Sequence, residues 1–237
     1  MGRNTNKAER NYKFATEMAY KFLIDENITS FPIDIFKITK KHKWSITTFE
    51  QIANDLNISY EMLKASLDDA WGTVHYNGIN YAIAYDNMLC KGAQYFTILH
   101  EIGHIVLEQL TEEGCIKIHA NKIISGDPEV YKKMEDEANC FARNVAAPIF
   151  LLDEIKHSLD AKYLVDCFKI TQKAAKTRLD FTTTDRFYLS DINQSELIYN
   201  CSNFLSKLEK PDFLGEIYHQ VIKDIDKRLC FNTTVKI

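Results

Sequence analysis

The chain has 237 residues, of which 46% are hydrophobic and 26% are charged, the proportions of an ordinary soluble globular protein. Its formal net charge of -4 argues against a protein whose whole surface attracts nucleic acid or an anionic membrane. The composition includes only 8 Gly and 4 Pro, which favours a mostly helical fold with short connections.

Two further features of the sequence indicate where in the cell the protein is expected. No segment resembles a signal peptide, and no run of about 18 apolar residues could span a membrane. The six cysteines are scattered without a C-x-x-C pair, which is typical of reduced thiols. We therefore expect a cytoplasmic protein without a membrane partner.

The N-terminal part is predicted to form short helices. Apolar side chains recur at helical spacing through residues 7–24, and Pro32 opens a second helix that continues to about Lys40. Residues 47–68 favour two short helices hinged at Asn57–Ser59, the outline of a helix-turn-helix. Its second helix is acidic rather than basic, so we expect it to pack against the protein rather than to contact DNA.

A β-hairpin is predicted in the middle of the chain. The segment "TVHYNGINYAIAY" places two β-rich runs around Asn77–Gly78, a dipeptide suited to a type I′ turn. We expect the second strand at about Ile79–Tyr85 and a helix at about Ala93–Leu110. Residues 115–124, "CIKIHANKII", are a less certain strand, and a further helix is expected at about Glu129–Ala147.

The C-terminal part again favours helices. Residues 163–181 resemble a second helix-turn-helix with four basic side chains, although exposed lysines on a solvated helix face are the simpler interpretation. Residues 211–229 begin with a proline and carry an apolar face, as a helix docked on a core would.

The segment "ILHEIGHIVLEQL" contains the strongest chemical signal. His100 and His104 lie one turn apart on a helix, so both imidazoles can reach one metal ion. Glu101 lies beside that point and could take a proton from water, while Gly103 would let another backbone pack closely. This H-E-x-x-H arrangement predicts two Zn²⁺ ligands and a catalytic carboxylate. The alternative is a pair of core histidines with ordinary hydrogen bonds.

A catalytic zinc site needs a third protein ligand. The metzincin continuation is excluded, because Leu107 and Leu110 stand where glycine and histidine are required. The downstream segment "MEDEANCFARNVAAP" supplies two candidates. We prefer Glu137, which shares a helix face with apolar residues expected to pack inward. Glu135 points about 200° away around the helix and is its competitor.

Two motifs together resemble a known family. "FTILHEIGH" followed by "EDEANCFA" is similar to the ImmA/IrrE family of metallopeptidases, in which an H-E-x-x-H helix is paired with a downstream E-A-x-x-F-A helix. The second element reads Glu137, Ala138, Phe141 and Ala142 here, and the hairpin ahead of the metal helix also matches. The resemblance covers about residues 10–180.

The resemblance implies a fold as well as a function. We expect an α+β, mostly helical protein with a zincin-like metallopeptidase core, in which a small sheet or hairpin precedes the H-E-x-x-H helix. The expected regions are an N-terminal helical region (1–70), the catalytic core (71–155) and a C-terminal helical region (156–237).

The implied function is that of a zinc-dependent endopeptidase. Its substrate would be a specific intracellular helix-turn-helix repressor, cleaved by an anti-repressor of a phage or mobile element or by a stress regulator. Glu101 would carry the proton from water to the leaving amine. His75, Tyr76 and His119 are candidates for stabilising the oxyanion, and strand Ile79–Tyr85 could bind substrate as an added strand.

Two other functions compete with this one. The protein could be a non-catalytic, zinc-stabilised anti-repressor that acts by protein binding, but a purely structural zinc would be indifferent to Glu101. It could also be a DNA-binding regulator that uses residues 163–181 and senses a metal. The net charge of -4 argues against this second alternative, and direct nucleic-acid binding is not expected.

Overall fold

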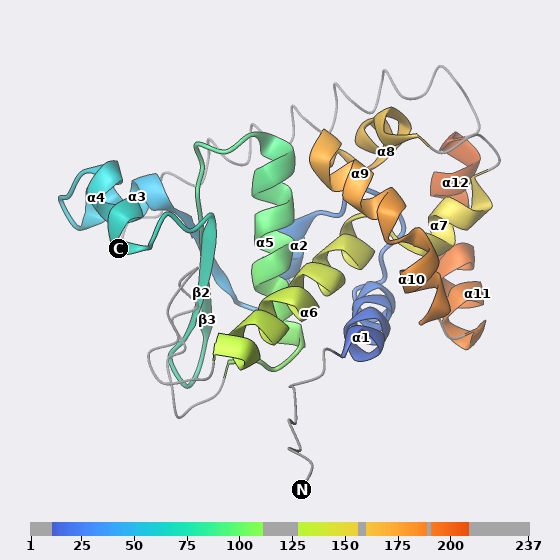
Figure 1. The fold of residues 1–237 in the computed structure, drawn as a ribbon, viewed down its shortest axis with the longest axis horizontal. Helices are drawn as coiled ribbons and strands as arrows, with labels where there is room; N and C mark the ends of the chain where they lie inside the picture. Colours follow the sequence, from blue (N-terminus) through green and yellow to red (C-terminus); the bar gives the residue numbers. More distant parts are fainter. Residues whose placement is uncertain (1–10, 111–127, 156–159, 189–190, 209–237) are drawn as a thin grey trace, which may run out of the picture.

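Helical periodicity dominates the sequence, and the computed structural model is accordingly mostly helical, with a small sheet (Figure 1). It describes residues 11–110, 128–155, 160–188 and 191–208. Within those residues the elements are α1 (Tyr12–Asp25), α2 (Ile35–Lys41), β1 (Ser45–Thr48), α3 (Phe49–Asp55), α4 (Tyr60–Ser66), β2 (Gly72–Tyr76), β3 (Tyr81–Tyr85), α5 (Lys91–Val106), α6 (Pro128–Ala146), α7 (Ile149–Glu154), α8 (Ala161–Phe168), α9 (Gln172–Asp180), α10 (Thr182–Phe187), α11 (Asp191–Asn200) and α12 (Ser202–Leu208). The α+β class expected from the sequence is confirmed.

Most of the predicted helices are present, and polar side chains mark where they begin. The two helix pairs expected within 47–68 and 163–181 are α3–α4 and α8–α9. Thr48, Ser59 and Thr171 each accept a backbone N–H from the first turn of the following helix, which satisfies a donor that the helix itself cannot. The strand expected at 115–124 and the helix expected at 211–229 lie outside the described residues.

The sheet has three strands in the order β1-β3-β2. β3 pairs in parallel with β1 and antiparallel with β2. The four-residue strand β1 was not predicted, because its pairing partner lies more than thirty residues away in the sequence. We expected that a substrate peptide could pair with strand Ile79–Tyr85 as an added strand. This expectation is wrong, since β3 is the central strand and both of its edges are already paired.

The predicted hairpin forms, but its turn is longer than expected. Tyr76 and Tyr81 are the last paired residues, so a four-residue loop replaces the two-residue type I′ turn. Asn77 holds this loop, because its side-chain oxygen accepts the backbone N–H groups of Ile79 and Asn80. Gly78 has the positive φ of 87° expected from its position in the turn.

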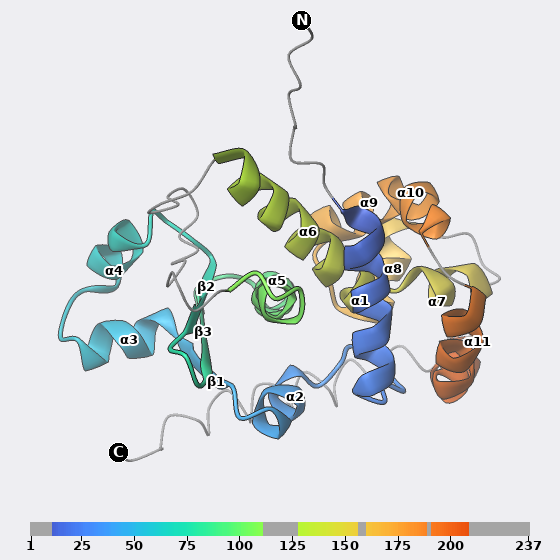
Figure 2. The same ribbon diagram turned by 90° about the horizontal axis from the view of Figure 1, so that it is seen from below.

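Helix α5 lies in the middle of the molecule. Viewed from below, α5 is seen nearly end-on between the sheet and helices α1 and α6, while α3 and α4 lie on the other face of the sheet (Figure 2). Alternation along β3 explains these two layers. Ile83 belongs to the main core with Leu99 and Ile102 of α5, whereas Ala84 packs with Phe49 of α3 in a second, smaller cluster.

Helices α5 and α6 cross closely at Gly103. A Cβ atom on this glycine would lie 3.1 Å from Phe141 Cδ1 and 3.3 Å from the Ala138 carbonyl oxygen. The expectation that Gly103 lets another backbone approach is therefore confirmed, and α6 is the approaching element. No helix among the described residues is long and apolar enough to cross a membrane.

A buried charged cluster connects α6 to the C-terminal helices. Asp185 is fully buried and accepts hydrogen bonds from Arg143 of α6, from Arg178 of α9 and from the Asn144 amide. Arg178 is itself only 1% exposed. These contacts neutralise charges that would be very unfavourable alone in a core, and they link α6 to α9 and α10.

Removing the acid of this cluster should therefore destabilise the fold. We expect Asp185→Ala to lower the free energy of unfolding by about 3–5 kcal/mol, because two guanidinium groups lose their buried partner. The matched control is Asp153→Ala, which breaks the exposed ion pair with Arg186 and should cost less than about 1 kcal/mol. Urea denaturation of both variants measures the difference, and equal small effects would show that the cluster is not a stabilising contact.

Candidate metal centre

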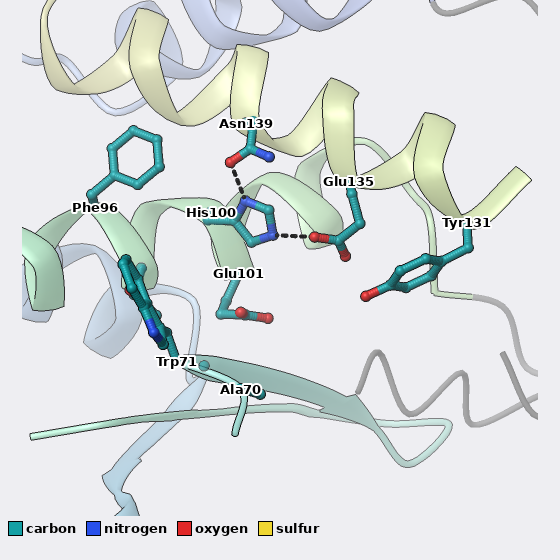
Figure 3. A pocket seen from close by; sticks show the side chains of 10 residues that line it. Ala70, Trp71, Phe96, His100, Glu101, Tyr131, Glu135 and Asn139 are labelled. Carbon is teal, nitrogen blue, oxygen red and sulfur yellow. Dashed lines mark hydrogen bonds and ion pairs between the residues drawn. The ribbon is translucent and has the colours of Figure 1, made fainter. Parts of the chain in front are cut away.

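The two histidines of α5 converge on one point. His100 and His104 are one turn apart, and their Nε2 atoms lie 3.1 Å from each other. His104 is fully buried, and the His100 side chain is 14% exposed. The carboxylate of Glu135 on α6 reaches the same point, with one oxygen 3.3 Å from His100 Nε2 (Figure 3). The other oxygen lies 3.4 Å from His104 Nε2.

These three side chains fit the geometry of a metal site. One ligand atom from each of His100, His104 and Glu135 can be chosen so that all three lie within 4.8 Å of one another. Ligands of a tetrahedral Zn²⁺ ion about 2.1 Å from the metal lie about 3.4 Å apart, which is close to the separations of these atoms. In addition, Glu135 Oε1 is buried and accepts no hydrogen bond from the described residues. Burying an unpaired carboxylate oxygen costs free energy, and a bound cation would offset that cost.

The protonation states of the three side chains also suit metal binding. Burial lowers the pKa of His104, which favours the neutral imidazole that a metal requires. Burial alone would raise the pKa of the Glu135 carboxyl, but its contacts with His100 and His104 outweigh burial and hold this pKa well below the usual range. Glu135 is therefore an ionised ligand candidate at neutral pH.

Glu101 lies next to this group without belonging to it. Its side chain is 4% exposed and faces the same pocket as His100 and Glu135 (Figure 3). Burial raises the pKa of the Glu101 carboxyl to about 8, and its Oε2 atom accepts no hydrogen bond from the described residues. A nearby cation would favour the ionised form. Glu101 is therefore placed to exchange a proton with a molecule in the pocket.

The preference for Glu137 as the third ligand is corrected by the structure. Glu135, the competitor, lies beside the histidines, whereas Glu137 accepts the backbone N–H of Asn11 at 2.7 Å and the side-chain amide of Gln109 at 3.1 Å. Glu137 does face inward, at 7% exposed, as its helix face predicted. The error was to assume that an inward-facing acid must bind a metal, when a carboxylate can also be satisfied by two N–H donors.

Two amide side chains orient the imidazoles. His100 Nδ1 lies 3.1 Å from Asn139 Oδ1, and His104 Nδ1 lies 2.7 Å from Gln109 Oε1. Sequence analysis missed both residues. Asn139 could have been found, because it lies four residues after Glu135 on the same helix face. Gln109 could not have been found from helical spacing, because it lies beyond the end of α5, where the chain reverses through Glu108 with a positive φ of 54°.

A pocket of about 210 Å³ opens beside Glu101. Its walls come from α5, from α6 and from residues 70–72, where β2 begins, and they include Trp71, Phe96 and Tyr131 (Figure 3). Gly72 brings β2 close to the carboxylate, because a Cβ atom at that position would lie 2.7 Å from Glu101 Oε1 and 2.5 Å from Thr97 Cγ2.

Two of the three residues expected to stabilise an oxyanion are not among the described residues that line this pocket. His75 and Tyr76 lie on β2 but do not contribute to the pocket walls, and His119 lies outside the described residues. Tyr131 of α6 lines it instead, with its hydroxyl group directed toward Glu135 (Figure 3). Tyr131 is therefore the phenol donor that the structure places beside the three metal-ligand candidates.

Comparisons with protein-family models, with curated proteins and with solved structures find no match to this chain.

If His100, His104 and Glu135 hold a metal, removing the carboxylate should weaken its binding. We expect Glu135→Ala to lose more zinc affinity than the roughly 10- to 100-fold typical for loss of an outer hydrogen-bonding partner of a ligand. Glu101→Gln, which keeps all three ligands, should retain zinc. Competition with a chromophoric chelator measures both affinities. Unchanged affinity in Glu135→Ala would exclude this residue as a ligand.

Proposed function

We propose that this protein is a zinc-dependent peptidase with a zincin-like core, in which His100, His104 and Glu135 bind the metal and Glu101 is the general base. The observation that carries the proposal is the position of Glu101, whose buried carboxylate faces the pocket beside the three ligands and has an oxygen without a hydrogen bond among the described residues. Two imidazoles and one carboxylate, with a further position open to water, are the donor set of a hydrolytic zinc site.

Each residue has a distinct part in the proposed hydrolysis. When bound, Zn²⁺ would lower the pKa of water to about 7 and polarise the carbonyl group to be cleaved. Glu101 accepts the proton of the attacking water and then donates it to the nitrogen of the leaving amine. Tyr131, on the α6 side of the pocket, carries a hydroxyl that can donate a hydrogen bond to the carbonyl oxygen as negative charge develops there.

The pocket suits an extended peptide. Among the described residues, β2 is an outer strand of the sheet with β3 as its neighbour, and it begins at Gly72 beside Glu101. A peptide lying along β2 could form main-chain hydrogen bonds as an added strand. Trp71, which is 55% exposed, and Phe96 line the pocket and offer an apolar contact for a substrate side chain.

The proposed substrate is a helix-turn-helix repressor in the cytoplasm. This part of the proposal depends on the similarity of "FTILHEIGH" and "EDEANCFA" to the ImmA/IrrE motifs. Recognition of one regulator would give narrow rather than general proteolysis.

Direct binding to nucleic acid has less support. Residues 163–181 contain four basic side chains, but Arg178 is buried against Asp185. The backbone of Lys169 packs against the start of α5 at Gly92, where an added Cβ would lie 3.0 Å from the Lys169 carbonyl oxygen. Lys173 and Lys176 remain as the exposed cations of this segment.

Glu101→Gln tests the proposed chemistry. The test is co-expression with the helix-turn-helix regulator encoded nearest to this chain's gene, followed by blotting of the regulator. We expect a shorter fragment with the wild type and a loss of about 10²- to 10⁴-fold in cleavage rate with Glu101→Gln at equal zinc content, because the amide cannot accept the proton.

The result also separates peptidase activity from simple binding. An intact regulator that co-purifies equally with the wild type and with Glu101→Gln would contradict the peptidase proposal. It would favour a non-catalytic, zinc-stabilised anti-repressor that acts by protein binding.

Gly72→Ala tests the contact between β2 and the proposed base. The added methyl group would displace the Glu101 carboxylate, so we expect cleavage to fall by about 100-fold, the effect of a misplacement near 1 Å, while zinc content stays unchanged. Gly78→Ala is the control: it strains the hairpin loop, where φ is 87°, but has no atom within 4 Å to displace. Equal activity in the two variants would show that the position of β2 is not critical.

A further inference from the structure

Two consecutive buried hydrogen bonds connect Glu137 of α6 to His104, one of the proposed ligands. Glu137 accepts the Nε2 amide of Gln109 at 3.1 Å, and the Oε1 atom of the same amide lies 2.7 Å from His104 Nδ1. The three residues are 7%, 8% and 0% exposed, respectively. Water therefore has little access to substitute for either contact.

The chemistry of the three groups permits only one direction for these hydrogen bonds. A carboxylate can only accept, so the NH₂ group of Gln109 must face Glu137. The carbonyl oxygen of Gln109 then faces His104, and an oxygen can only accept from Nδ1–H. With the proton on Nδ1, the lone pair of the neutral imidazole is on Nε2, the atom that faces His100 and Glu135.

From this we infer that Glu137 is a positioning residue of the metal centre, which acts through Gln109 to hold His104 in the Nδ1–H tautomer with Nε2 available to a metal. The inference rests on the metal site of the proposed function. It also gives the second glutamate of the "EDEAN" segment a role, since Glu135 would bind the metal while Glu137 would determine which nitrogen of His104 can do so.

Glu137→Gln should exchange the donor and acceptor roles in both hydrogen bonds, while the side chain at position 137 keeps almost the same shape. The introduced amide can still accept the Asn11 N–H with its oxygen, but its NH₂ group then faces Gln109. The Gln109 amide must turn over to accept, and its own NH₂ group then faces His104 Nδ1. That contact favours the Nε2–H tautomer, which cannot bind a metal through Nε2.

A double variant that combines Gln109→Glu with Glu137→Gln should restore the original direction. The carboxylate introduced at position 109 would accept both from the amide introduced at position 137 and from His104 Nδ1–H, so the lone pair returns to Nε2. Gln109→Glu alone should not restore it, because this change places two carboxylates in contact. Glu129→Gln, an exposed change on the same helix, is the control.

Two measurements test the inference. In the metal-free protein, long-range ¹H–¹⁵N NMR of the imidazoles should report Nδ1–H at His104 in the wild type, in Glu129→Gln and in the double variant, but Nε2–H in Glu137→Gln. Chelator competition should give a zinc affinity about 10- to 100-fold weaker for Glu137→Gln than for the wild type, with recovery in the double variant.

The outcomes distinguish this inference from the proposed function. An unchanged tautomer and a zinc affinity within about twofold of wild type in Glu137→Gln would overturn the inference and leave Glu137 as an anchor for Asn11. If Glu137→Gln does not fold, failure of the folded double variant to show Nδ1–H and wild-type zinc affinity would overturn it equally. A wild type that binds zinc but cleaves nothing would contradict the peptidase proposal and leave the tautomer result intact.

Discussion

The close crossing of α5 and α6 at Gly103 determines the geometry of the site. Because Gly103 has no side chain, the backbone of Ala138 lies against α5, with an added Cβ only 3.3 Å from its carbonyl oxygen. Glu135 and Asn139, one helical turn apart on α6, then reach His100 directly. Glycine costs about 1 kcal/mol in a helix relative to alanine, and the contact between the two helices offsets this cost.

Several of the polar groups buried around this crossing have specific partners. His104 is fully buried between Gln109 and Glu135, while Glu137 is satisfied by Gln109 and the backbone of Asn11. Asp185 and its arginines similarly secure the later part of α6. Helix α6 supplies Glu135, Asn139 beside His100, and Glu137, which contacts the Gln109 amide beside His104.

Local patterns in the sequence were sufficient to predict one side of the site. The H-E-x-x-H spacing identified His100, Glu101 and His104 because all three lie on one helix, whose geometry follows from residue spacing alone. The choice between Glu135 and Glu137 failed because it depends on how α6 is rotated against α5. Glu137 is buried and Glu135 is partly buried, and only the crossing geometry determines which one meets the histidines.

The same limit applies to the rest of the fold. The hairpin and the α3–α4 and α8–α9 pairs were predicted from patterns within short stretches of sequence, such as the Asn77–Gly78 turn and the hinge at Asn57–Ser59. Strand β1 and the contact of Gln109 with Glu137 depend on partners that are 28 or more residues away, for which a single sequence carries no local signal.

X-ray absorption spectroscopy of the zinc-loaded protein would test whether two imidazoles and the Glu135 carboxylate hold one zinc ion. We expect one zinc with two imidazole nitrogens and oxygen ligands at about 2.0–2.2 Å, and no sulfur, since Cys140 on α6 packs against Thr16 of α1. A sulfur ligand at about 2.3 Å, or a spectrum without imidazole scattering, would contradict it.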